Sequence, residues 1–235
     1  HYMILGTSHM TSVKVEQDLN VTLDNSILDR VKYTKNVGVL IDENLTWKCH
    51  IDCVSKTLSR NIGIMNKLKY FIPARILHTL YCTFISPYLN YGLLIWGNTC
   101  KTYLDKLIKL QKWAIRTISN SHYRCHTRPL FKKYNILNIE DMYSLELGVF
   151  MYKYSVNELP NVFDNYFTKR SDIHDYQTRH VNDFNLTNNK KAFPDHSVRT
   201  GGPIIWNSLE EKIKNSKSVK QFRNQLKQNL ISNYI

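Results

Sequence analysis

The chain has 235 residues, 43% of them hydrophobic, and carries a formal net charge of +13. The hydrophobic content excludes an intrinsically disordered composition, and the length allows a sizeable core in one or two domains. Five cysteines, an odd number, argue against a complete disulfide framework, and no apolar run is long enough to span a membrane. The strong positive charge favours a polyanionic partner, with a basic but non-binding surface as the alternative.

Residues 1–48 are predicted to form a small antiparallel β region, because short apolar runs alternate there with polar residues. A turn is expected at Asp24-Asn25, and turn formers follow the last strand at Asp42-Glu43-Asn44. Leu45 and Trp47 then lie two apart, as on one face of an extended segment. The expected strands cover residues 2–5, 12–15, 19–23, 27–33 and 37–41, of which the last is β-branched and predicted to be well buried.

From about residue 51 the spacing of apolar residues becomes helical. A first helix is predicted at 51–70, and Gly63 inside it predicts close packing with a neighbour. A second helix should begin at Pro73 and end or kink at Pro87, followed by a buried segment up to Trp96. The apolar stripe of the first helix consists of Ile51, Val54, Leu58, Ile62 and Met65.

A third helix, predicted at 103–119, separates apolar from basic residues. Its expected core face consists of Leu104, Leu107, Ile108, Ile115 and Ile118. The segment from Lys101 to Lys133 holds nine Lys or Arg and a single acid, Asp105. A solvated helix face normally mixes both signs, so this cluster predicts contact with a polyanion, and a merely solvated face is the alternative. The basic residues proposed to make the contact are Lys106, Lys109, Lys112, Arg116, Arg124, Arg128, Lys132 and Lys133.

The remaining chain, residues 136–235, predicts a C-terminal helical region. A helix should begin after Asn138, a good N-cap, and continue to Pro160. A polar loop is expected at about 168–200, closed by Gly201-Gly202-Pro203. A short helix at 206–214 and a final helix after a capping box at Ser218–Gln221 complete the prediction. The fold class is therefore mainly α with a small N-terminal antiparallel β region (α+β).

Several short motifs follow one another along the chain. They are Gly38-Val39 with Ile41-Asp42, Leu45-x-Trp47 with His50-Ile51, Leu80-Tyr81, Pro87-Tyr88-Leu89, Tyr91-Gly92, Trp96-Gly97, Leu110-Gln111-Lys112, Gly202-Pro203 and Trp206-Asn207. In this order they resemble the region after the palm in reverse transcriptases of jockey-like non-LTR retrotransposons. Each motif alone is weak, and the ordered set is more specific. Val37 stands where that family usually has Leu.

The resemblance implies three regions: a post-palm hairpin at 1–50, a helical thumb at 51–135 and a C-terminal region at 136–235. It places Gly38, Trp47 and His50 near the primer end. The family's palm carboxylates, including an Asp-Asp pair, have no match, so no catalytic residues are assigned. The chain begins with His1, which predicts a fragment. No cofactor is expected in this chain, whereas the full polymerase would use magnesium; the setting implied by the resemblance is intracellular and includes the nucleus.

Other chemistry is less well supported. Cys49 and Cys53 are four apart, as are His78 and Cys82, but this is not a common zinc-ligand spacing, so we expect no metal site. No nucleophile accompanies the histidines.

Two interpretations remain. The first is a non-catalytic fragment that binds RNA–DNA hybrid, RNA or DNA without sequence preference. The second is a non-catalytic protein-interaction module that packs on a partner subunit or on the missing palm, and neither involves a membrane.

Overall fold

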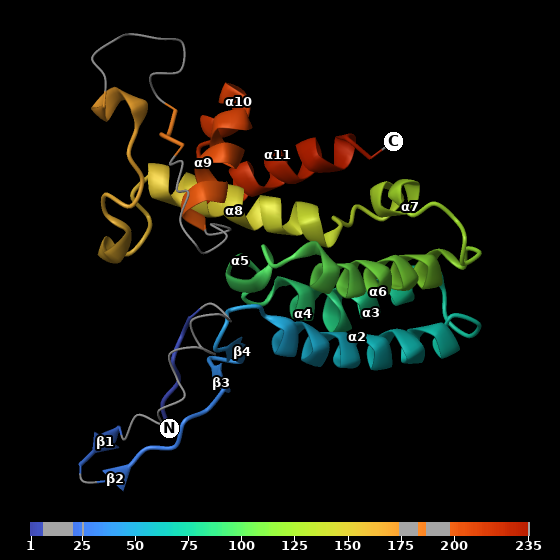
Figure 1. The fold of residues 1–235 in the computed structure, drawn as a ribbon. Helices are drawn as coiled ribbons and strands as arrows, with labels where there is room; N and C mark the ends of the chain where they lie inside the picture. Colours follow the sequence, from blue (N-terminus) through green and yellow to red (C-terminus); the bar gives the residue numbers. More distant parts are fainter. Residues whose placement is uncertain (7–20, 25, 174–182, 187–197, 235) are drawn as a thin grey trace.

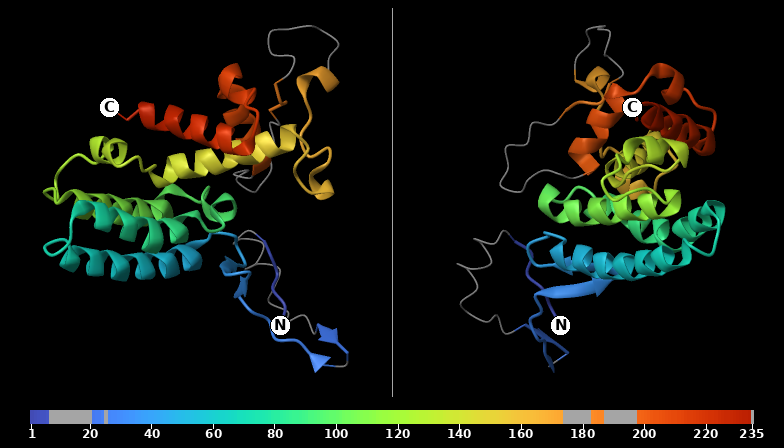
Figure 2. Two further views of the ribbon diagram at one scale, coloured as in Figure 1. Left: turned by 180° about the vertical axis from the view of Figure 1, so that it is seen from behind. Right: turned by 90° about the vertical axis from the view of Figure 1, so that its right-hand side faces the viewer.

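The computed structural model describes residues 1–6, 21–24, 26–173, 183–186 and 198–234. It confirms the predicted fold class: stacked helices follow a small N-terminal β region that extends away from them (Figures 1 and 2). The β region consists of two separate antiparallel pairs, β1 (Thr22–Leu23) with β2 (Ser26–Ile27) and β3 (Tyr33–Asn36) with β4 (Val39–Asp42). Among the described residues, no helix has the length and apolar character needed to cross a bilayer.

The predicted buried strand at 37–41 is wrong at its beginning. Asn36 pairs with Val39, so Val37 and Gly38 form a two-residue hairpin turn, with φ angles of 44° and 82°. Positive φ at both central positions defines a type I′ turn, which matches the twist of the flanking strands. Gly38 adopts this conformation without strain, and Val37 is 81% exposed at the hairpin tip. The turn geometry therefore sets the register, and the apolar run does not.

Other strand predictions also need correction. Residues 2–5 contribute only an isolated bridge between Tyr2 and Arg30, and the predicted strand at 27–33 is interrupted between β2 and β3. Leu45 and Trp47 have φ angles of 52° and 62°, so both adopt left-handed backbone conformations and do not form an extended segment. Residues 12–15 and 19–20 lie outside the described residues. Short apolar runs become strands only where a partner strand is in register, which their composition does not specify.

The first helical layer is formed by α2 (Lys48–Leu68) and α6 (Lys101–Ser119), which lie side by side. The predicted apolar stripe of α2 is confirmed, since all five residues are buried. Along the chain, α2 and α6 are separated by α3 (Ala74–Phe84), α4 (Ser86–Asn90) and α5 (Leu93–Trp96). The helix is broken just before Pro87, as predicted. The segment up to Trp96 is only partly buried: Leu89, Leu93 and Trp96 are buried, whereas Tyr88, Tyr91 and Ile95 are exposed.

The second helical layer continues the stack. It contains α7 (Arg128–Lys133), α8 (Ile139–Ser155), the 3-10 turns η1 (Asn161–Phe163) and η2 (Arg170–Asp172), α9 (Val198–Ser208), α10 (Glu211–Lys214) and α11 (Val219–Ser232). Asn138 caps α8 by accepting a hydrogen bond from the Asp141 N–H at 2.8 Å, as predicted. Ser218 caps α11 through the Gln221 N–H at 3.2 Å. In Figure 1, α8 lies between α6 and α11.

Gly201-Gly202-Pro203 was expected to close a loop, but these residues lie inside α9. The reason is a close approach between α9 and α8. A Cβ atom on Gly202 would lie 2.5 Å from Sδ of Met151, so the glycine lets α9 lie close to α8 and does not break the helix. Helix packing thus overrides the local turn signal. Most of the predicted polar loop at 168–200 lies outside the described residues.

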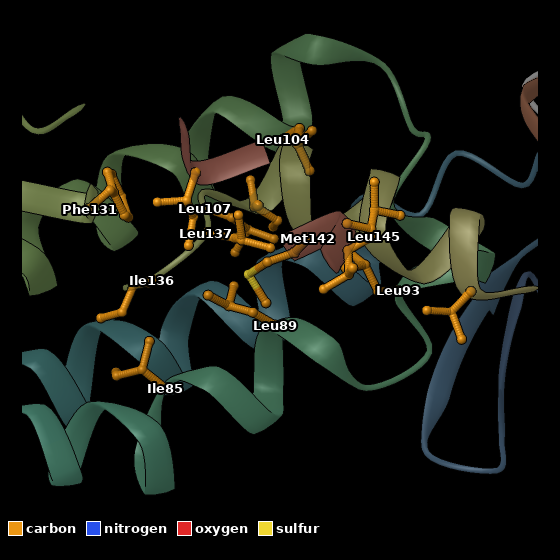
Figure 3. Close-up of a cluster of buried hydrophobic side chains, with 14 of the residues drawn as sticks. Ile85, Leu89, Leu93, Leu104, Leu107, Phe131, Ile136, Leu137, Met142 and Leu145 are labelled. Carbon is orange, nitrogen blue, oxygen red and sulfur yellow. The ribbon is translucent and has the colours of Figure 1, made fainter. Parts of the chain in front are cut away.

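The core joins both layers. Figure 3 shows Ile85 and Leu89 pointing toward side chains from α6 and α8. Leu107 of α6 is fully buried among them. Leu137 and Met142, at the start of α8, pack against the same cluster. Because residues from α3 to α8 share one apolar cluster, the position of the basic face of α6 depends on both layers.

Gly63, inside α2, and Gly97, at the end of α5, differ in their surroundings. A Cβ on Gly97 would lie 2.5 Å from the Leu93 carbonyl oxygen and 2.7 Å from the Tyr143 ring, whereas a Cβ on Gly63 would meet nothing within 4 Å. The close packing predicted at Gly63 is therefore wrong. It occurs instead at Gly97, where the chain leaves α5.

This contrast predicts opposite effects of the same substitution. Gly97→Ala should lower the free energy of unfolding by about 1–3 kcal/mol, because the methyl group overpacks a backbone carbonyl. Gly63→Ala should raise it by about 0.5–1 kcal/mol, because alanine has the higher helix propensity. Urea unfolding of both variants measures this, and a loss of stability in Gly63→Ala equal to that in Gly97→Ala would contradict the packing argument.

Candidate nucleic-acid interface

The candidate interface begins on α6. The residues that α6 buries in the core determine which of its other residues face solvent. Leu104, Leu107, Ala114, Ile115 and Ile118 are buried, and they recur at helical spacing. Ile108, which was predicted in the core, is only partly buried. At 100° per residue, Lys109 lies opposite the centre of this buried stripe. The core packing of α6 therefore directs Lys109 toward solvent.

The four residues of α6 that were predicted to contact a polyanion do not behave as one stripe. Lys109 and Lys112 are exposed and have no ion-pair partner among the described residues. Lys106 instead forms an ion pair with Asp52 of α2, with Nζ 2.6 Å from Oδ1. Arg116 is partly buried, and its Nε donates to the Cys125 carbonyl at 3.0 Å. Lys109 and Lys112 are thus available to a ligand, while Arg116 holds the following loop in place.

The loop and α7 carry the other predicted basic residues, all of which are exposed: Arg124, Arg128, Lys132 and Lys133. Two of them lie over aromatic rings. The Arg124 guanidinium is 5.1 Å from the centre of the Tyr123 ring, and Lys133 Nζ is 5.5 Å from that of Tyr134. These cation–π contacts hold the charges near the surface without neutralising them. Exposed aromatic side chains thus accompany the basic ones, and Tyr123 is 65% exposed.

Sequence reasoning missed the role of Asp42, which organises the junction between the hairpin and α2. Its carboxylate is 8% exposed and accepts three hydrogen bonds: from the Thr46 N–H and hydroxyl at 2.9 Å, and from the Trp47 N–H at 2.7 Å. These bonds hold Trp47 in the left-handed conformation that starts the helix. The sequence pattern that indicates this role is an Asp at the end of a strand with a Thr four residues later, at Thr46.

His50, expected near a primer, is buried behind the hairpin. Its Nδ1 accepts a hydrogen bond from the Leu40 N–H at 3.4 Å, and its ring centre lies 5.5 Å from that of Trp96. Burial lowers the pKa of His50 below its ordinary value, so the imidazole is neutral and carries its proton on Nε2. Gly38, Trp47 and His50 therefore first serve the local fold: Gly38 forms the hairpin tip, and the other two fix its base.

Gln111 is a second residue that sequence reasoning missed. It is 1% exposed and lies on the core side of α6. Its amide nitrogen donates to the Tyr81 hydroxyl and to the Leu137 carbonyl, both at 2.9 Å, and its amide oxygen accepts from the Ile139 N–H at 2.9 Å. One side chain thus joins α6, α3 and the start of α8. The sequence signal was a polar residue at a position where helical periodicity requires an apolar one.

No metal-binding arrangement is found in the part of the chain that the structure describes, since no three His, Cys, Asp or Glu side chains there are grouped to hold an ion. Cys49 and Cys53 are exposed on α2. Cys82 Sγ is 4.0 Å from His78 Nδ1, but His78 Nε2 faces the Tyr134 carbonyl at 3.2 Å. The donors described here do not fit the magnesium site that the resemblance implies for a full polymerase.

Known proteins resemble this chain over about half its length. A protein named probable RNA-directed DNA polymerase from transposon BS of Drosophila melanogaster is 25% identical over 127 residues, which is 53% of this chain and 14% of the relative. The RNA-directed DNA polymerase from mobile element jockey of Drosophila funebris is 28% identical over 115 residues, or 47% and 12%. The chain is similar to jockey-like reverse transcriptases. No protein-family model and no solved structure matches it.

The comparison confirms the resemblance first drawn from the ordered motifs, and the structure explains several motif residues in this jockey-like region. Asp42 and Gln111 hold element junctions together, and Gly97 allows a close approach. Trp96 donates its indole N–H to the Tyr91 carbonyl at 2.8 Å. These contacts are internal, so these four motif residues specify the scaffold. Lys109 and Lys112 of α6 and the three basic residues of α7, in contrast, are exposed.

Proposed function

We propose that this chain is a non-catalytic, thumb-like segment of a retrotransposon reverse transcriptase that holds the template–primer backbone through positive charge. The observation that carries the proposal is the run from Lys101 to Lys133, with nine basic residues and one acid. The residues assigned to backbone contact are Lys109, Lys112, Arg124, Arg128, Lys132 and Lys133, all of which are exposed. The similarity to RNA-directed DNA polymerases supports a nucleic acid as the polyanion.

The structure refines this assignment residue by residue. Lys106 is already paired with Asp52, so binding a phosphate through Lys106 requires that ion pair to open. Arg116 acts through the loop that it holds, because its Nε–H is bonded to the Cys125 carbonyl. Phosphate contacts of this kind fix a protein on a duplex and carry no sequence information. We therefore assign affinity for backbone charge and not sequence recognition.

Salt dependence tests this proposal. Replacing Lys109, Lys112, Lys132 and Lys133 with Gln should weaken binding to an RNA–DNA hybrid by a similar factor for every sequence. For every phosphate that the variant no longer binds, the slope of log affinity against log salt should fall by about 0.7–0.9. The fold should be unaffected, because exposed substitutions of this kind usually change stability by less than about 0.5 kcal/mol. Fluorescence anisotropy at several salt concentrations measures the slope.

A matched control removes charge elsewhere on the chain. Lys212 and Lys220 are exposed on α10 and α11, outside the basic run. Lys212→Gln with Lys220→Gln should leave the slope nearly unchanged, while Lys109→Gln with Lys112→Gln should lower it. Lys106→Gln should have a smaller effect than Lys109→Gln, because its charge is already compensated. Equal slopes in the two double variants would show that only net charge matters and would contradict a defined interface.

A second candidate is the non-catalytic protein-interaction module. The observation that favours it is the exposure of Tyr70 and Phe71, at 73% and 83%, in the connection between α2 and α3. Large exposed aromatic side chains are enriched where proteins bind one another. In this case the palm or another partner would cover Tyr70 and Phe71. An unchanged salt slope in the quadruple Gln variant would favour this candidate over backbone binding.

We also expect this chain alone to show no polymerase activity and to need no cofactor. Nucleotidyl transfer requires carboxylates that hold two metal ions about 3.5–4 Å apart. The chain contains no adjacent Asp pair, and its described acids form no such group. Primer extension on an RNA template with magnesium checks the expectation, with a complete reverse transcriptase as the positive control. Template-dependent extension by the pure chain would contradict it.

A further inference from the structure

A pocket of about 390 Å³ lies where the β3–β4 hairpin meets α2 and α4. It is separate from the basic residues of α6 and α7. Its volume lies at the lower end of the range of ligand pockets, about 300–1,000 Å³, which suits one small ring system. The lining includes Lys35, His50, Cys53, Val54, Tyr88 and Tyr91.

Two aromatic rings in the lining remain open to a ligand. Tyr88 is 43% exposed and Tyr91 is 51% exposed, whereas Val54 at the α2 side of the pocket is buried. The Tyr91 hydroxyl donates to the Val37 carbonyl, which fixes this ring against the hairpin tip. Exposed ring faces of this kind are surfaces on which a planar heterocycle can stack.

Polar groups around the pocket favour a nucleic-acid ligand over a purely apolar one. Nε2 of His50 is buried and has no hydrogen-bond partner among the described residues. Because Nδ1 accepts from the Leu40 N–H, Nε2 carries the proton, and this N–H is closed off from solvent. Lys35 adds a positive charge to the lining. Arg60, seven residues after Cys53 on α2, is exposed on the same helix face.

We propose that this pocket holds one unpaired nucleobase, stacked on Tyr88 and Tyr91, with the adjoining phosphate near Lys35. The inference rests on the proposed nucleic-acid binding and adds a specific site to it. Stacking of a base on Tyr88 and Tyr91 explains why these two rings are exposed beside the pocket. The phosphate would pair with the positive charge of Lys35, which is exposed in the lining. Every base has a π face, so the pocket requires no particular sequence.

A fluorescent base tests the site directly. The probe is an RNA–DNA hybrid with a single unpaired 2-aminopurine at one end, since 2-aminopurine emission falls when the base stacks on an aromatic ring. Wild-type protein should quench the emission. Tyr88→Ala should abolish this quenching and weaken binding by about fivefold, the lower limit for the loss of one stacked base. Tyr88→Phe keeps the ring and should behave like wild type.

Two further variants separate the pocket from the basic surface. Cys53→Phe places a side chain from an exposed helix position into the pocket and should also abolish quenching. Lys109→Gln with Lys112→Gln should weaken binding but leave quenching at saturation unchanged. Quenching that persists in both Tyr88→Ala and Cys53→Phe overturns the pocket proposal while salt-dependent binding stands. Failure of wild-type protein to bind the probe at any salt concentration overturns the proposed function itself, and this inference with it.

Discussion

Replacing Gln111 with leucine is expected to lower the free energy of unfolding by about 3 kcal/mol. The substitution leaves the Leu137 carbonyl, the Ile139 N–H and the Tyr81 hydroxyl without their partner inside the core. Each unsatisfied buried group costs about 1–3 kcal/mol, and the gain from burying leucine offsets part of the sum. Burial raises the pKa of Tyr81, so its hydroxyl stays protonated. It therefore cannot become a tyrosinate that would accept the Ile139 N–H in place of the Gln111 amide oxygen.

Urea unfolding followed by circular dichroism measures this loss. The control is Lys112→Gln at the adjacent, exposed position, which should change stability by less than about 0.5 kcal/mol. A loss below about 1 kcal/mol in Gln111→Leu would mean that the three groups find other partners. Because Gln111 joins α6 to the start of α8, we also expect the variant to loosen the second layer against the first. Hydrogen exchange at Ile139 would report this.

Asp42→Ala is expected to destabilise the chain by about 2–4 kcal/mol. The buried carboxylate accepts three hydrogen bonds, and its loss leaves the Thr46 and Trp47 N–H groups without an acceptor. Trp47 has a φ of 62°, a conformation that costs a bulky residue free energy unless its surroundings hold it. The start of α2 should therefore fray, and the hairpin should lose its fixed orientation relative to the helices.

The matched control for Asp42→Ala is Asp52→Asn, four residues into α2. Asp52 is 39% exposed and pairs with Lys106, so breaking this exposed ion pair should cost no more than about 1 kcal/mol. Urea unfolding compares the two variants, and hydrogen exchange at residues 46–51 locates the effect. Equal losses in the two variants would contradict the view that Asp42 organises the junction. The same experiment tests whether the hairpin pocket depends on this carboxylate.

Positions on long amphipathic helices were predictable from the sequence. The stripe from Ile51 to Met65 is buried because its period matches one face of a helix, whichever partner covers it. Asn138 and Ser218 cap their helices because each bond closes within a few residues. The jockey-like resemblance was likewise readable from ordered motifs. In each case the information is local or lies in residue order.

The tertiary structure alone decided which basic residues of α6 remain open to a ligand. Lys106 is paired because Asp52, 54 residues earlier, lies beside it across the α2–α6 contact, whereas Lys109 and Lys112 are exposed and have no ion-pair partner among the described residues. It also decided that Gly97 and not Gly63 is tightly packed, and that Tyr88 and Tyr91 line a pocket. Periodicity gives the angle of a side chain around its helix axis. What lies at that angle depends on elements that are distant in the chain, and only their packing supplies it.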